Sequence, residues 1–111
     1  MSSTQSFESV RSPAVASLFY PGNPLELQQN VRELLDEASQ DVDLPDERIL
    51  RALIVPHAGY VYSGSTAAKA YRLLNNYRDE FRRIILLGPE HRVWIEGLAI
   101  PGVEAFDTPL G

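Results

Sequence analysis

The sequence contains no cysteine among its 111 residues. Disulfide bonds are therefore excluded within these residues, and so is any metal site built from thiolates. A metal ion bound here would need histidine, carboxylate, hydroxyl or main-chain oxygen ligands. The chain has only two histidines, His57 and His91, so these two positions are the first to consider.

Positive charge is also scarce, with 10 Lys and Arg against 15 Asp and Glu and a formal net charge of -5. Nucleic acid and anionic membrane both require a basic surface, so neither is expected as a partner. The polar start of the chain has no secretory signal, and no apolar run approaches the roughly 20 residues that span a bilayer. A cytoplasmic location is expected by default, and 44% hydrophobic residues are typical of globular protein.

The chain is long enough for one domain at most. Residues 1–10 are Ser- and Thr-rich and are predicted to be a disordered N-terminus, whereas residues 11–111 are predicted to form the N-terminal part of a single α/β domain. A first helix is predicted from the N-cap Asn23 and Pro24 to about Ser39. Its buried face is predicted to carry residues at helical spacing, namely Leu27, Val31, Leu34, Leu35 and Ala38. The acidic segment Gln40–Glu47 is expected to be a surface loop.

Apolar runs predict strands at Ile49–Val55 and Arg83–Leu87 and a third at Leu98–Ile100. A second helix is predicted to begin at Gly64 or Ser65. A strand, helix and strand of this length normally form a right-handed parallel crossover, which brings the carboxyl ends of both strands to one sheet edge. Because these elements cannot cover both faces of a parallel sheet, the chain is expected to be truncated, with further strands beyond Gly111.

The two histidines occupy equivalent positions, because His57 directly follows the first predicted core strand and His91 follows the second. Neighbouring strands lie about 4.8 Å apart, so both imidazoles can reach one ion or one substrate. The alternative is that each ring satisfies local backbone groups. Their matching positions favour a shared metal site.

Gly59, Tyr60 and Glu90 flank the histidines and are the candidates for substrate binding. Tyr60 either offers a phenolic hydroxyl to a substrate or packs over the sheet edge, and Gly59 permits close approach of a ligand. Glu90 is a metal ligand, a general base or a solvent-facing loop residue, and we favour the solvent-facing position. Tyr62 and Trp94 are predicted to pack. No catalytic residue is assigned, because no acid can be paired with a serine and a histidine.

Four sequence strings carry a resemblance to a known family. They are Arg11-Ser-Pro-Ala-Val-Ala with Phe19-Tyr-Pro21, then Leu53-Ile-Val-Pro-His-Ala-Gly-Tyr-Val-Tyr-Ser-Gly64, then Leu86-Leu-Gly-Pro-Glu-His91, and Thr108-Pro-Leu-Gly111. In this order and spacing they resemble the Memo family (mediator of cell motility), also known as protein B of the AmmeMemoRadiSam system. The resemblance extends over residues 11–111.

The resemblance implies a fold similar to the class III extradiol dioxygenases and makes His57 and His91 ligands of a non-haem metal, iron or copper. It implies a third ligand from a C-terminal part outside these residues. Two functions follow as expectations: a metal-dependent oxidoreductase, or a non-catalytic module that binds a peptide or partner protein in the same cleft. Animal members are associated with signalling peptides, and bacterial and archaeal members with radical-SAM and AMMECR1-like companions.

Overall fold

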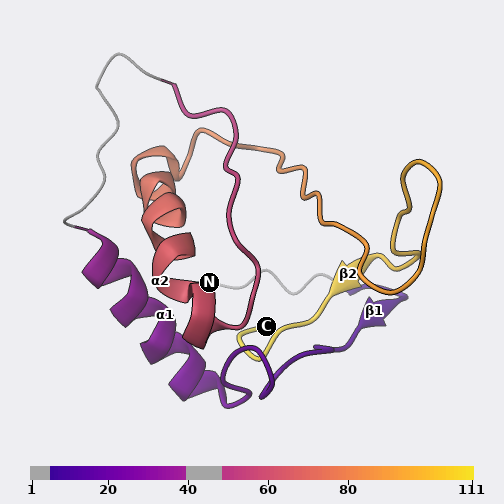
Figure 1. The fold of residues 1–111 in the computed structure, drawn as a ribbon, viewed down its shortest axis with the longest axis horizontal. Helices are drawn as coiled ribbons and strands as arrows, with labels where there is room; N and C mark the ends of the chain where they lie inside the picture. Colours follow the sequence, from indigo (N-terminus) through magenta and orange to yellow (C-terminus); the bar gives the residue numbers. More distant parts are fainter. Residues whose placement is uncertain (1–5, 40–48) are drawn as a thin grey trace.

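Two helices and a short parallel strand pair make up the regular structure of the chain. The computed structural model describes residues 6–39 and 49–111. Its elements in chain order are β1 (Val10–Arg11), α1 (Pro24–Ala38), α2 (Tyr60–Tyr71), the 3-10 helix η1 (Arg72–Tyr77) and β2 (Ala105–Phe106). The two helices lie side by side, while β1 and β2 meet at the other end of the molecule (Figure 1). No helix in the described ranges is long and apolar enough to cross a membrane.

Helix α1 forms where the sequence predicts it. Asn23 caps it, since its Oδ1 accepts hydrogen bonds from the backbone N–H groups of Leu25 at 2.9 Å and Glu26 at 3.2 Å. The helix ends at Ala38, with Ser39 as its C-cap. Each member of the predicted apolar stripe is buried or half-buried, Leu27 and Ala38 most completely. Local capping and periodicity therefore specify this element.

Helix α2 begins at Tyr60, ahead of the predicted start at Gly64 or Ser65. The prediction was wrong because tertiary contacts extend the helix toward its N-terminus. The N–H of Tyr60 donates to the Phe19 carbonyl at 2.7 Å, and Ser63 Oγ donates to the Ala58 carbonyl at 3.1 Å. Packing against a neighbour outweighs the weak helix propensity of an aromatic and β-branched sequence. His57 therefore lies just ahead of the first helical turn.

The three predicted core strands are absent from the described residues. Ile49–Val55, Arg83–Leu87 and Leu98–Ile100 have no strand hydrogen bonding, and Figure 1 shows them as plain traces. An apolar run favours a strand only when a neighbouring strand accepts its backbone hydrogen bonds and covers its side chains. Here Ile84 is 79% exposed and Leu86 is 88% exposed. The strand prediction was therefore wrong for these segments.

The parallel sheet that does form joins the two ends of the described chain. Val10 pairs with Ala105 and Arg11 with Phe106, and the N–H of Asp107 donates to the Arg11 carbonyl at 2.8 Å. An α/β fold with parallel pairing is thus present, but its strands are not those that precede the histidines. Two predictions fall wholly or partly outside the described residues: the surface loop at Gln40–Glu47, and disorder in residues 1–10, of which 1–5 are not described.

The chain keeps an unusually large surface for its mass. Its accessible area is 10170 Å², whereas a compact chain of 12.4 kDa exposes about 6,100 Å². Among the described residues, the buried apolar core consists of Leu27, Ala38, Leu50 and Ala68. The core therefore lies at the helix pair, and the segments that follow η1 leave an open cleft beside it.

Candidate functional site

The two histidines of the chain meet side chain to side chain. The Nε2 atoms of His57 and His91 lie 3.1 Å apart. Their ring centroids are 5.1 Å apart, with the planes inclined by 51°. The structure thus brings together the two residues that the sequence singled out, although the segments that carry them are not paired strands.

The position of His57 follows from the start of α2. His57 lies two residues before the N-cap Gly59. The hydrogen bonds that Ser63 gives to Ala58 and Tyr60 gives to Phe19 fix the backbone directly after the histidine. The backbone that carries His57 is therefore constrained, so less conformational entropy is lost when the imidazole ring binds a ligand.

His91 lies on a loop that closes on itself through Glu90. The Glu90 Oε2 atom accepts a hydrogen bond from the backbone N–H of Ile95 at 2.7 Å. Glu90 is exposed and does not line the cavity beside the histidines. This hydrogen bond from Ile95 to Glu90 stabilises the loop that carries His91.

The separation of the two nitrogens matches two ligands of one metal ion. Nitrogen ligands with bonds of about 2.0 to 2.1 Å lie about 2.9 Å apart at a right angle and about 3.3 Å apart at the tetrahedral angle. The observed 3.1 Å falls between these values. It also suits a single N–H···N hydrogen bond between neutral rings of opposite tautomer. The geometry therefore fits a metal without requiring one.

Two imidazoles do not complete a metal site. Across residues 6–39 and 49–111 no group of three or more His, Cys, Asp or Glu side chains is arranged to hold an ion. A further ligand would have to come from solvent, a substrate or residues outside those described. The pair alone would supply only two of the ligands that an ion needs.

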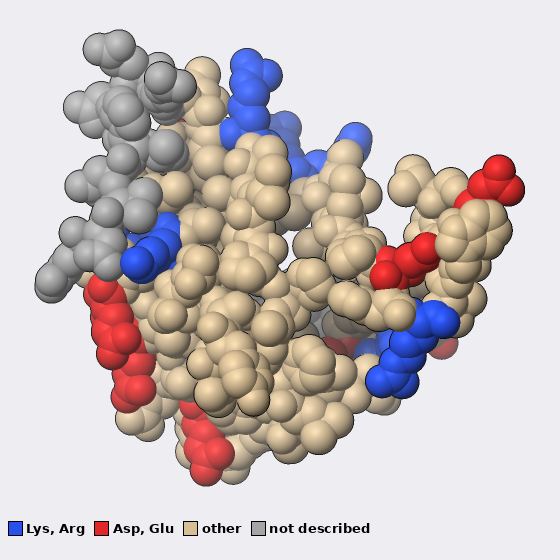
Figure 2. All heavy atoms as spheres, viewed as in Figure 1, with Lys and Arg blue, Asp and Glu red and all other residues tan. Residues whose placement is uncertain are grey.

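A large apolar cleft adjoins the histidine pair, with a cavity volume of about 930 Å³. Its walls come from the turn at Phe19 and Tyr20, from α1 and α2, and from the extended segments around Val55, Leu86 and Ile100. No Lys, Arg, Asp or Glu is among the described residues that line it. Figure 2 shows charged side chains mostly around the periphery of the face and uncharged atoms around its hollow centre. The cleft suits an apolar ligand.

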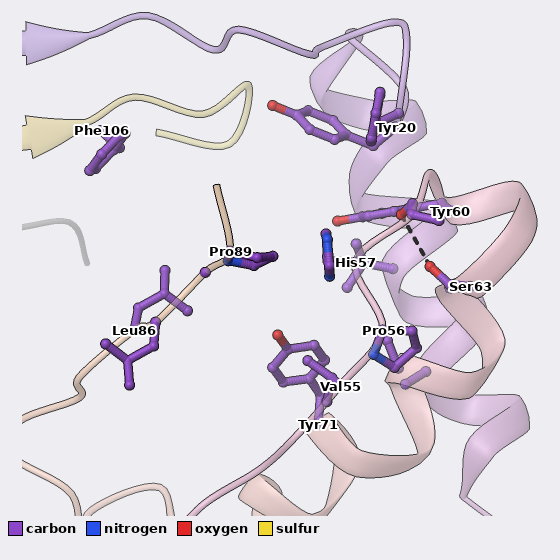
Figure 3. A pocket seen from close by; sticks show the side chains of 18 of the residues that line it. Tyr20, Val55, Pro56, His57, Tyr60, Ser63, Tyr71, Leu86, Pro89 and Phe106 are labelled. Atoms are coloured by element: carbon purple, nitrogen blue, oxygen red, sulfur yellow. Dashed lines mark hydrogen bonds between the residues drawn. The ribbon is translucent and has the colours of Figure 1, made fainter. Parts of the chain in front are cut away.

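Three tyrosines are among the polar residues that line this cleft, namely Tyr20, Tyr60 and Tyr71. Figure 3 shows Tyr60 and Tyr71 pointing into the space beside His57, with Tyr20 above Tyr60. The rings of Tyr20 and Tyr60 lie 5.7 Å apart. Burial raises the pKa of Tyr60 above its ordinary value, and the neighbouring Tyr20 and Tyr71 raise it further. The Tyr60 hydroxyl thus stays protonated and able to donate at neutral pH.

Three other residues lie outside the cleft. Gly59 is close to the Phe19 backbone, since a Cβ atom there would lie 3.4 Å from the Phe19 carbonyl oxygen. Gly59 therefore serves the contact between the turn and α2. Tyr62 is 85% exposed and Trp94 is 79% exposed, so the prediction that both pack was wrong.

The sequence reading missed Tyr20 and Tyr71 as residues of the cleft. Tyr71 lies eleven positions after Tyr60, about three helical turns, which places both on one face of α2. This spacing places Tyr60 and Tyr71 on the same face only if the helix begins at Tyr60, whereas the sequence predicted a start at Gly64 or Ser65. Tyr20 reaches the cleft from the turn in which the Ser17 N–H donates to the Tyr20 carbonyl, and the contact of this turn with α2 joins residues far apart in the sequence.

Fold and site together define an α/β protein in which two histidines converge beside an apolar cleft lined with tyrosines. The family model described as Memo-like protein matches residues 11–111. The chain therefore belongs to the Memo-like family, and the resemblance in its motifs is confirmed.

Relatives in distant organisms support this membership. The chain is 38% identical over 104 residues to a protein memo-1 homolog of Caenorhabditis elegans, which covers 94% of this chain and 28% of that protein. It is 37% identical over 103 residues to a MEMO1 family protein of Aquifex aeolicus, and this match covers 92% of this chain and 35% of the relative. A MEMO1 family protein of Thermoplasma volcanium is 37% identical over 102 residues, again with 92% and 35% covered. The chain thus spans about a third of the length of these relatives, and no solved structure matches it.

Proposed function

We propose that His57 and His91 form part of a non-haem metal site, with iron or copper as the ion, in a metal-dependent oxidoreductase of the dioxygenase-like kind that the family resemblance implies. The observation that carries the proposal is the 3.1 Å separation of the two Nε2 atoms, which is the spacing of adjacent ligands on one ion. Family membership supports it, because the two histidines lie within the matched residues.

In this proposal each side chain has a defined task. A bound iron or copper ion would supply Lewis acidity and one-electron redox chemistry. His57 and His91 each hold it through Nε2, and Glu90 positions His91 through its bond to Ile95. The apolar walls of the cleft would contact the apolar part of the substrate. The remaining ligands would come from solvent, the substrate or residues outside those described.

The second candidate function is a binding module that holds a peptide or a partner protein in the same cleft without chemistry. A radical-SAM or AMMECR1-like companion is the partner that the family resemblance suggests. The observation in its favour is that most side chains lining the cleft are apolar, which suits an apolar segment of a peptide or partner protein. Peptide titration of the metal-free protein tests this alternative.

The metal proposal is tested by equilibrium dialysis against Fe²⁺ and Cu²⁺, followed by metal analysis of the protein. Replacing an outer-shell partner typically lowers metal affinity about 10- to 100-fold, so removing a ligand should cost at least that much. We expect such losses for His57→Ala and for His91→Ala. Metal retained equally by the wild type and both variants would refute the proposal.

A further inference from the structure

Helix α2 presents two tyrosine side chains to the cleft, one from each end of the helix. Tyr60 and Tyr71 are its first and last residues, and both line the cavity together with His57 and His91. Figure 3 shows the two phenolic oxygens directed into the space on either side of His57. Small side chains lie between them on the same helix face, including Ser63 and Ala67. The two phenols therefore flank an open, shallow stretch of the helix surface.

Both hydroxyls are available to a ligand. Among the residues that the structure describes, neither Tyr60 nor Tyr71 gives or receives a side-chain hydrogen bond. A phenol donates one hydrogen bond from its O–H group and prefers a partner when it is partly buried. Tyr60 is half-buried, and Tyr71 lies at the more open end of the cleft with 44% exposure. Each is thus an unused donor facing the cavity.

The remaining lining limits the charge of the ligand. The described cleft residues include no lysine or arginine that could pair with an anion, and no acid that could pair with a cation. Moving an ion into such surroundings without a partner is costly, whereas an uncharged oxygen needs only one donor. The cavity volume of about 930 Å³ lies within the usual range of small-molecule sites.

We propose that this cleft binds an uncharged, largely apolar small molecule through an oxygen acceptor, with the hydroxyls of Tyr60 and Tyr71 as the hydrogen-bond donors beside the histidine pair. The inference deepens the proposed function, since it names the class of ligand that the same cleft takes. The phenols act without an ion, so the ligand class and the metal site can be tested separately.

Acetophenone is the probe, because it joins one carbonyl acceptor to an apolar ring. Ethylbenzene has nearly the same shape without the acceptor, and benzoate adds a charge. Each is titrated into the full chain in EDTA and followed by amide chemical shifts of α2. We expect Tyr60→Phe/Tyr71→Phe to weaken acetophenone about three- to tenfold while leaving ethylbenzene unchanged. The single variants assign the donor.

Tyr62→Phe is the matched control, since Tyr62 is on the same helix, is 85% exposed and does not line the cavity. It should leave the affinity for acetophenone unchanged, and benzoate should bind more weakly than acetophenone. Unchanged acetophenone affinity in the double variant would overturn the proposal, as would tighter binding of benzoate. Because EDTA is present and both histidines are intact, failure here leaves the metal test standing, and failure of the metal test leaves this one standing.

Discussion

His57 and His91 bring their Nε2 atoms to 3.1 Å although no strand pairing joins the segments that carry them. Their approach depends on the constrained start of α2 on one side and on the loop closed by Glu90 on the other. Because the two segments are not paired as strands, the contacts at the start of α2 and within the Glu90 loop hold the two imidazole rings in place. Changes to those contacts should therefore affect the site more than changes to the extended segments.

Glu90→Ala should loosen the His91 loop, because it removes the carboxylate that accepts from the Ile95 N–H at 2.7 Å. We expect faster hydrogen exchange at the Ile95 amide and lower metal affinity, with a loss smaller than the roughly tenfold effect of removing a group that bonds a ligand directly. Glu90→Gln, which retains an oxygen acceptor, should fall between the wild type and Glu90→Ala. Amide exchange measured by NMR and metal dialysis test both effects.

Glu96→Ala is the control for that experiment, since Glu96 has no hydrogen bond to another described group. It should leave exchange at Ile95 and metal affinity unchanged. Equal effects of the Glu90 and Glu96 substitutions would show that the loss of a negative charge, and not the loss of the Glu90–Ile95 hydrogen bond, causes the change in exchange and metal affinity.

The free energy of unfolding should decrease as the pH rises through the alkaline range, because Tyr60 loses its proton more readily in the unfolded chain than in the folded one. Burial raises its pKa above the ordinary value for tyrosine, and the neighbouring Tyr20 and Tyr71 raise it further. Below about pH 10 the phenol is protonated in both states, and the stabilisation is complete. As pH rises further the unfolded chain releases this proton first, so stability falls until the folded-state pKa is passed.

Urea unfolding between about pH 9 and pH 11 tests this dependence. Tyr60→Phe should make the loss of stability less steep than in the wild type. Tyr62→Phe, at an 85% exposed position of the same helix, should leave the slope as it is. A slope that does not change in Tyr60→Phe would mean that other groups account for the alkaline loss.

The helix pair should carry most of the stability of the chain. Leu27 on α1 is only 4% exposed, so Leu27→Ala should lower the free energy of unfolding by about 2 to 4 kcal/mol. Leu25, two residues earlier and 76% exposed, should tolerate the same change within about 0.5 kcal/mol. Chemical denaturation of the two variants makes the comparison, and similar losses would contradict the assignment of the core.

The sequence was most informative where the determinants are local. Asn23 and Pro24 specify the start of α1, and the apolar period specifies its buried face, because capping and amphipathicity act within a few residues. The histidine pair was also identified in advance, from its position after two apolar runs. Family membership, predicted from the motifs, is confirmed over residues 11–111.

Sequence reasoning failed where distant contacts decide the outcome. The strands predicted around Val55 and Leu86 need hydrogen-bonded neighbours, and an apolar run does not reveal whether a partner is present. The early start of α2 depends on the Phe19 carbonyl, forty-one residues before Tyr60. For the same reason the sequence did not predict that Tyr71 lines the cleft, since the cleft forms between α2 and segments distant in the chain.

Pulsed EPR of the Cu²⁺-loaded protein shows whether both imidazoles bind the same ion. Modulations from the remote imidazole nitrogens count the histidines on the copper. We expect two histidines on the copper in the wild type and one in each of His57→Ala and His91→Ala. A single histidine on the wild-type copper, or a spectrum unaffected by either substitution, would contradict this expectation.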